Sequence, residues 1–132
     1  MTSHGALLPT SSDVVIDVSV WVSTILVRDS NHPVALAWVT QHLLAGRLLV
    51  APILLVTETA SDVARITGHP VRGHQAAGQL YALPEMSLVQ IDQTLVDEAT
   101  DLTPDLRLCG ADSYYVALAK KLDLLLVIFD TE

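Results

Sequence analysis

The sequence contains a single cysteine, Cys109. One cysteine excludes an internal disulfide and any zinc site built from several cysteines. This fits a reducing compartment, so we expect a cytoplasmic protein. The first residues lack the basic start and apolar core of a secretory signal. The longest uncharged apolar run, residues 48–56, is far shorter than the roughly 20 residues of a membrane helix.

Positive charge is also scarce. The sequence has seven Lys and Arg residues and fifteen Asp and Glu residues, which gives a formal net charge of −8. This balance argues against broad electrostatic binding of nucleic acid. It suits a cluster of carboxylates that holds cations, or a basic protein partner.

The bulk composition predicts one globular domain. Hydrophobic residues make up 51% of the chain and charged residues 17%, which is typical of a folded protein and not of a disordered one. A chain of 132 residues is long enough to bury its own core. We expect a flexible tail over residues 1–12, rich in Ser, Thr, Gly and Pro, and a single domain over residues 13–132.

Short apolar segments alternate with segments of helical spacing. Strands are expected at residues 13–17, 47–51, 87–91 and 124–129. Helices are expected at residues 19–27 with Ser19 as N-cap, and at 33–45, 53–66, 70–82, 94–102 and 110–121. Strands that are apolar throughout and separated by helices indicate a parallel sheet covered on both faces. The predicted fold class is α/β.

Four acidic residues stand at positions where such folds build sites. Asp17 follows the first strand and Asp130 the last, Glu58 lies in the apolar stretch ILLVTETA, and Asp112 lies near a helix start. Sites in parallel sheets lie beyond the carboxyl ends of the strands. Gathered carboxylates repel one another unless a cation neutralises them. Mg²⁺ and Mn²⁺ prefer oxygen ligands, and metal-assisted phosphodiester hydrolysis uses such a set.

Four segments resemble the successive motifs of the PIN domain (PilT N-terminus) family, in particular the VapC-like toxins of toxin–antitoxin pairs. They are VVIDVSVWV, APILLVTETASDVA, LCGADSYYVALAKKLD and LLLVIFD, and they extend from Val14 to the end of the chain. The resemblance implies a three-layer α/β/α sandwich with a central parallel β-sheet. It also implies Mg²⁺- or Mn²⁺-dependent RNA cleavage, a homodimer and a neutralising antitoxin.

The resemblance assigns a role to each acid. Asp17, Glu58, Asp112 and Asp130 match the four acidic positions of the family in order, which makes them the predicted catalytic and metal-ligating residues. Ser19 matches the small polar residue beside the first acid.

Other interpretations stay open. Asp130 is followed by only two residues, so a catalytically inactive PIN-like module for binding or dimerisation is one alternative. A phosphoaspartate receiver or a dehalogenase-like phosphatase also places Asp after the first strand. The receiver would need a preceding acidic pair and a late Lys, and the phosphatase would need an acid where Ser19 stands; neither pattern is present.

Individual residues also have purely structural interpretations. Asp17 is a candidate cap, and Asp112 a candidate helix-start acid stabilised by the macrodipole. Asp62, four residues after Glu58, is expected to pair with Arg65 or Arg72 on the surface. Tyr114 and Tyr115 are expected to pack rather than to stack on bases, although Tyr115 lies one helical turn from Asp112. Among the basic residues, Arg28, Arg107 and Lys120 lie nearest to the motif segments.

Overall fold

The computed structural model describes residues 12–129. Almost all of the expected tail, and also Asp130, therefore lie outside the described residues. The strands are β1 (Val14–Ile16), β2 (Leu49–Pro52), β3 (Met86–Val89) and β4 (Leu126–Val127). They form one sheet in the order β3-β2-β1-β4, and every neighbouring pair is parallel.

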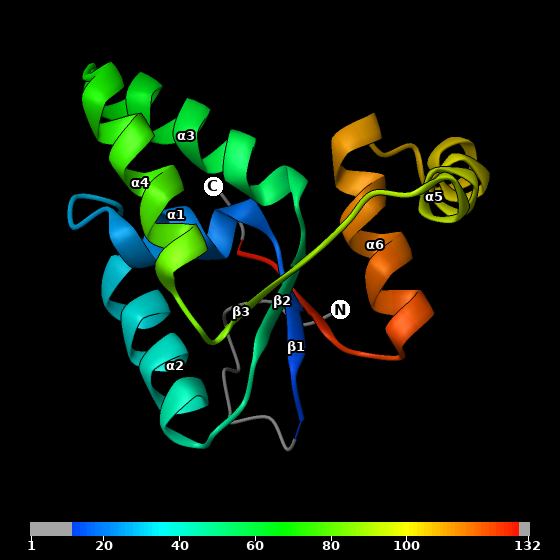
Figure 1. The fold of residues 1–132 in the computed structure, drawn as a ribbon, viewed down its shortest axis with the longest axis horizontal. Helices are drawn as coiled ribbons and strands as arrows, with labels where there is room; N and C mark the ends of the chain where they lie inside the picture. The colour runs from blue at the N-terminus through cyan, green and yellow to red at the C-terminus, as the bar shows by residue number, and fades with distance from the viewer. Residues whose placement is uncertain (1–11, 130–132) are drawn as a thin grey trace.

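Helices cover both faces of the sheet. They are α1 (Val18–Ile25), α2 (His32–Leu44), α3 (Leu54–Thr67), α4 (Pro70–Ala82), α5 (Gln93–Leu106) and α6 (Gly110–Leu122). Figure 1 shows α1 and α2 on one side of the sheet and α5 and α6 on the other, with the α3–α4 pair above the carboxyl ends of the strands. This arrangement confirms the predicted α/β/α sandwich. None of the helices in residues 12–129 combines the length and hydrophobicity needed to cross a membrane.

The strands lie at the centre of the core because their residues are apolar on both faces. Val14, Val15 and Ile16 are completely buried, and the four residues of β2 are buried as well. Burying this apolar surface is the main favourable term in folding. Helix α3 ends as expected, with Gly68 in the left-handed conformation at φ 73°, which glycine adopts without steric cost.

Several local predictions differ from the structure. The last strand, expected at residues 124–129, spans only Leu126–Val127. Helix α1 begins at Val18, and its N-cap is Asp17, not Ser19. The reason is that Asp17 is extended and accepts the backbone N–H of Ser19 at 3.1 Å, so it satisfies one of the free donors of the first turn. Helix α5 continues to Leu106, past the expected end at residue 102.

Two glycines on α4 predict opposite effects of the same substitution. A Cβ at Gly73 would lie 2.5 Å from the carbonyl oxygen of Ala60 on α3, whereas a Cβ at Gly78 would meet nothing within 4 Å. Gly73→Ala should destabilise the fold by about 1–3 kcal/mol through overpacking. Gly78→Ala should stabilise it by up to about 1 kcal/mol through helix propensity. Urea denaturation of both variants checks this, and equal effects would contradict the α3–α4 contact.

Candidate active site

Asp17 is held rigidly where β1 meets α1. Its backbone N–H donates to the carbonyl of Val127 on β4 at 3.1 Å, and its own carbonyl accepts the N–H of Val20 at 3.1 Å. Its carboxylate accepts the N–H of Ser19. The sheet and the helix together therefore fix the position of this carboxylate at the carboxyl edge of β1.

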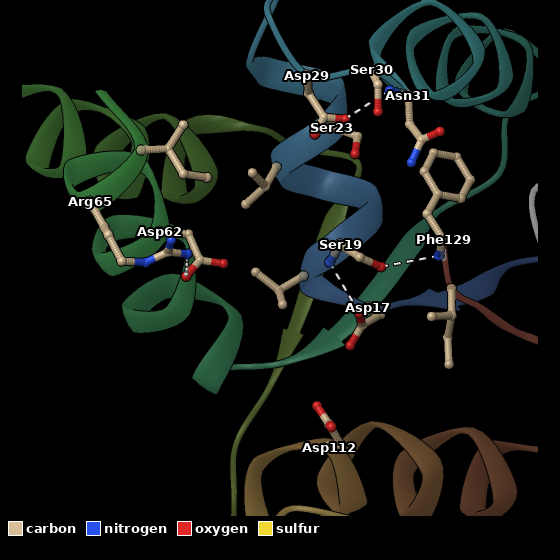
Figure 2. A pocket seen from close by; sticks show the side chains of 14 residues that line it. Asp17, Ser19, Ser23, Asp29, Ser30, Asn31, Asp62, Arg65, Asp112 and Phe129 are labelled. Carbon is tan, nitrogen blue, oxygen red and sulfur yellow. Dashed lines mark hydrogen bonds and ion pairs between the residues drawn. The ribbon is translucent and has the colours of Figure 1, made fainter. Parts of the chain in front are cut away.

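Ser19 connects this junction to the end of the last strand segment. The N–H of Phe129 donates to Ser19 Oγ at 3.1 Å, and the backbone N–H of Ser19 donates to Asp17 Oδ2 at 3.1 Å. Figure 2 shows Ser19 between the two, joined by one dashed line to Phe129 and by another to Asp17. The residue that precedes Asp130 in sequence is thus hydrogen-bonded beside the first predicted ligand.

Glu58 lies in the second turn of α3 and faces the core side of α6. Tyr115 donates its hydroxyl hydrogen bond to Glu58 Oε1 at 2.5 Å. Tyr115 is almost completely buried, as the sequence predicted, but the sequence analysis missed this contact with the site. The available signal was its spacing, because a residue three positions after Asp112 lies on the same helical face.

Asp112 occupies the first turn of α6. Its side chain points from α6 toward Asp17, which stands at the start of α1 (Figure 2). Negative charge is favourable at a helix start because the macrodipole is positive there. The helix therefore stabilises this carboxylate and also aims it at the site.

The three carboxylates interact electrostatically although they come from distant segments. Burial raises the pKa of Asp17, hydrogen bonds from Ser19 oppose that rise, and the nearby Asp112 adds to it. Burial also raises the pKa of Glu58, the hydrogen bond from Tyr115 lowers it, and both Asp17 and Asp112 raise it further. Burial and the Glu58 carboxylate raise the pKa of Tyr115, which keeps its hydroxyl protonated as a donor.

No cation in the described residues balances these charges. The ion pairs within residues 12–129 are Arg65 with Asp62 and Lys121 with Glu98. The ion pair with Arg65 confirms the expected pairing of Asp62. The three carboxylates offer only oxygen atoms as ligands and have no positive partner in the described residues, which suits a hard divalent cation.

The side chains as they lie do not yet form a complete metal site. Within residues 12–129, no three His, Cys, Asp or Glu side chains are grouped closely enough to hold a metal ion. Glu58 is directed to Tyr115, and Asp130 lies outside the described residues. The assignment of Asp17, Glu58, Asp112 and Asp130 as metal ligands therefore stays a prediction.

A pocket of about 430 Å³ opens beside Asp17 and Asp112. Its lining is mainly acidic and polar (Figure 2), with the charged residues Asp17, Asp29, Asp62, Arg65 and Asp112 and the polar residues Ser19, Ser23, Ser30 and Asn31. Ile128 and Phe129 close one side. The pocket is large enough for a phosphodiester group and lies at the carboxyl edge of the sheet, where the sequence placed it.

The family profile of the PIN domain matches residues 14–132. This chain belongs to the PIN domain family. A search of curated protein sequences found no match. The family membership confirms the resemblance drawn from the four sequence motifs.

Solved structures share the fold of this PIN domain. One is VapC20 of Mycobacterium tuberculosis, described as a sarcin–ricin loop cleaving toxin, with a TM-score of 0.74 and 20% identity over 90% of this chain and 91% of that one. Another is a toxin–antitoxin complex from Klebsiella pneumoniae, with a TM-score of 0.54 and 16% identity over 86% of this chain and 82% of that one. At these identities the likeness establishes the fold.

The raised pKa of Asp17 predicts a pH-dependent stability difference in metal-free protein. Ionising a carboxyl whose folded pKa lies above its unfolded value, near 3.9, destabilises the fold. The penalty is absent below the unfolded pKa and is complete above the folded one. Asp17→Asn keeps an oxygen that can cap α1 but removes the charge. In EDTA its melting temperature should therefore exceed that of the wild type by a few degrees at pH 7 and by less at pH 4. A difference in melting temperature between Asp17→Asn and the wild type that becomes smaller as the pH rises would contradict the burial of this charge.

Removing the Tyr115 hydroxyl should weaken both the fold and the Glu58 carboxylate. Tyr115→Phe leaves Glu58 Oε1 without its donor, which should cost about 1–2 kcal/mol in urea denaturation. It should also raise the pKa of Glu58 further, measurable by carboxyl NMR. Tyr114→Phe is the matched control, since the Tyr114 hydroxyl has no hydrogen-bond partner in the described residues. Equal losses of unfolding free energy in Tyr115→Phe and Tyr114→Phe would contradict a specific contact between Tyr115 and Glu58.

Proposed function

We propose that this PIN domain is a Mg²⁺- or Mn²⁺-dependent endoribonuclease and the toxin of a VapBC-type toxin–antitoxin module. One observation carries the proposal. Asp17, Glu58 and Asp112 come from the β1–α1 junction, α3 and α6, and they meet at one edge of the sheet. Asp112 raises the pKa of Asp17, both raise the pKa of Glu58, and no cation within residues 12–129 pairs with them. Folding gathers these charges against their mutual repulsion, which is understandable if a divalent cation occupies the site.

The residues have distinct roles in this proposal. Asp17 and Asp112 would hold the first cation, and Glu58 and Asp130 would complete the site. The bound cations would supply an activated water and stabilise the leaving oxygen. Phe129, which precedes Asp130 in the sequence, donates its N–H to Ser19 Oγ. Because water and not the ribose hydroxyl attacks phosphorus, the products would carry a 5′-phosphate and a 3′-hydroxyl.

The solved relatives support the biological part of the proposal. VapC20 is described as a toxin that cleaves RNA at the sarcin–ricin loop, and the Klebsiella structure is described as a toxin–antitoxin complex. By analogy we propose an antitoxin partner for this chain, a homodimeric assembly and a cytoplasmic location. The RNA substrate is proposed at the level of a phosphodiester chain.

A second candidate is a catalytically inactive PIN module that serves binding or dimerisation. The observation that favours it is the lack of a ready three-ligand metal group within residues 12–129. Metal affinity separates the two candidates, since an inactive module has no need to bind a divalent cation.

Calorimetric titration of Mn²⁺ tests the proposal without knowledge of the RNA. The wild type should show saturable binding, and Asp112→Asn should weaken it at least about tenfold, because loss of even an outer-shell partner has effects of that size. Asp105→Asn is the control, since it removes the same charge from an exposed position on α5.

Ribonuclease assays follow the same design. Total RNA and a sarcin–ricin loop oligonucleotide should be cleaved by the wild type and by Asp105→Asn but not by Asp112→Asn. A wild type that binds no Mn²⁺ would refute the nuclease proposal and favour the interaction module.

A further inference from the structure

A second cavity adjoins the acidic pocket. It has a volume of about 710 Å³ and lies between residues 25–30, at the end of α1 and the following loop, and residues 66–72, at the α3–α4 turn. The two cavities share Asp29, Ser30 and Ile66 in their walls. Figure 2 shows Asp29 and Ser30 at the end of the acidic pocket away from Asp112. A ligand chain that leaves the pocket at this end would enter the second cavity directly.

The sign of the charge reverses between the two cavities. The acidic pocket is lined by four carboxylates and one arginine, Arg65. The second cavity is lined by two arginines, Arg28 and Arg72, and one carboxylate, Asp29, together with His69. Asp29 is partly engaged already, because its Oδ2 accepts the N–H of Asn31 at 3.0 Å. The second cavity is thus positive at neutral pH.

Arg28 and Arg72 are available for an external anion. Both are exposed, and neither forms an ion pair or hydrogen bond with a side chain in the described residues. Arg65, on the shared rim, pairs with Asp62 at 3.2 Å. Arginine presents its donors as a planar fork that matches phosphate geometry, so unpaired arginines in a cavity are suited to bind phosphate.

This grouping matters because the chain has so few cations. Three of its seven Lys and Arg residues, namely Arg28, Arg65 and Arg72, line these two contiguous cavities. The net charge of the whole chain, −8, repels a polyanion. The second cavity is a local exception, because its two arginines outnumber its one carboxylate.

We propose that the second cavity binds the phosphodiester backbone of the RNA strand adjacent to the scissile phosphate, with Arg28 and Arg72 as the phosphate contacts. This inference rests on the proposed ribonuclease function and adds a binding subsite to it. Among the residues lining the cavity, none is Phe, Tyr or Trp, so base stacking of the kind that aromatic side chains provide is not available. The subsite should therefore hold the strand without reading its sequence.

Continuity with the acidic pocket favours RNA over an acidic protein segment as the occupant. A strand whose scissile phosphate lies near Asp17 and Asp112 has further phosphates on either side, and the second cavity is the neighbouring space with matching charge. The apolar side chains of Ile25, Leu26 and Ile66 in its walls can contact sugars without excluding the charged backbone.

The test compares two double variants of equal charge. Arg28→Ala/Arg72→Ala removes the proposed contacts, and Lys120→Ala/Lys121→Ala removes two positive charges from the last turn of α6, the end of that helix remote from Asp112. Each changes the formal net charge from −8 to −10. The probe is a fluorescein-labelled 15-nucleotide oligouridylate, because a sequence-independent subsite needs no particular sequence. Ca²⁺ replaces Mg²⁺ to limit cleavage, and a gel confirms that the probe stays intact.

The arginine variant should bind the probe roughly tenfold more weakly at 50 mM salt, whereas the lysine variant should bind like the wild type. For the arginine variant, the slope of log affinity against log salt concentration should become shallower by about 1.4, since each phosphate contact on a single strand contributes about 0.7 to that slope. Arg28→Lys/Arg72→Lys should keep most of the slope. The Mn²⁺ affinity and the melting temperature of the arginine-to-alanine variant should match those of the wild type, because both arginines are exposed and unpaired in the described residues.

Three results would overturn the inference, and they can be told apart. Equal losses in the arginine and lysine variants would indicate a general charge effect and no subsite. Unchanged binding in the arginine variant, with a wild type that binds and cleaves RNA, would leave the proposed function standing and assign the cavity to a protein partner. A wild type that binds Mn²⁺ but neither binds nor cleaves RNA would refute the proposed function and the subsite together.

Discussion

The placement of the Asp17 carboxylate at the end of β1 is the constraint on which the rest of the site depends. The backbone of Asp17 is bonded to β4 on one side and to the first turn of α1 on the other, so the carboxylate cannot move away from its neighbours. Burial makes its charge unfavourable. The Ser19 N–H and the positive end of α1 offset part of this cost. Within residues 12–129, however, two further carboxylates and no paired cation lie near Asp17. The resulting unfavourable electrostatic energy is what a bound cation would relieve.

The core and the site are built from the same helix. Helix α6 packs Tyr115 and Leu118 into the core and carries Asp112 in its first turn. Tyr115 also orients Glu58 on α3 through its hydroxyl. Packing of one helix against the sheet therefore sets the position of two of the predicted ligands. Burial raises the pKa of Asp17 and of Glu58, so their ionised forms are unfavourable in the fold, yet the surrounding core keeps both carboxylates in place, a balance often found between stability and function.

The charge distribution reconciles an acidic protein with a polyanionic substrate. A net charge of −8 describes the whole surface, but local fields decide where a ligand approaches. The acidic pocket attracts cations, and the adjoining arginines lie in a region that attracts phosphate. Separation of the two signs over neighbouring cavities would place the proposed metal and the proposed RNA strand at the same edge of the sheet.

Local physical chemistry explains why much of this molecule follows from its sequence alone. The apolar runs around Val15 and Val50 predict buried parallel strands because no polar side chain interrupts them, and Gly68 marks a helix end because it tolerates a positive φ. The acids at strand and helix ends, Asp17 and Asp112, could be placed at one sheet edge by the same reasoning. Even the cap of α1 was misassigned by only two positions, since Asp17 and Ser19 are both good caps.

Only the tertiary structure decided which side chains meet. The hydrogen bond from Tyr115 to Glu58 spans 57 positions, and that from Phe129 to Ser19 spans 110. Arg28 lines one cavity from the α1–α2 loop, and Arg72 lines the same cavity from the first turn of α4. No local pattern encodes such pairs, because they depend on how whole helices pack against the sheet. Propensity, capping and periodicity act between near neighbours in sequence, whereas the shape and charge of a site are set by contacts between elements.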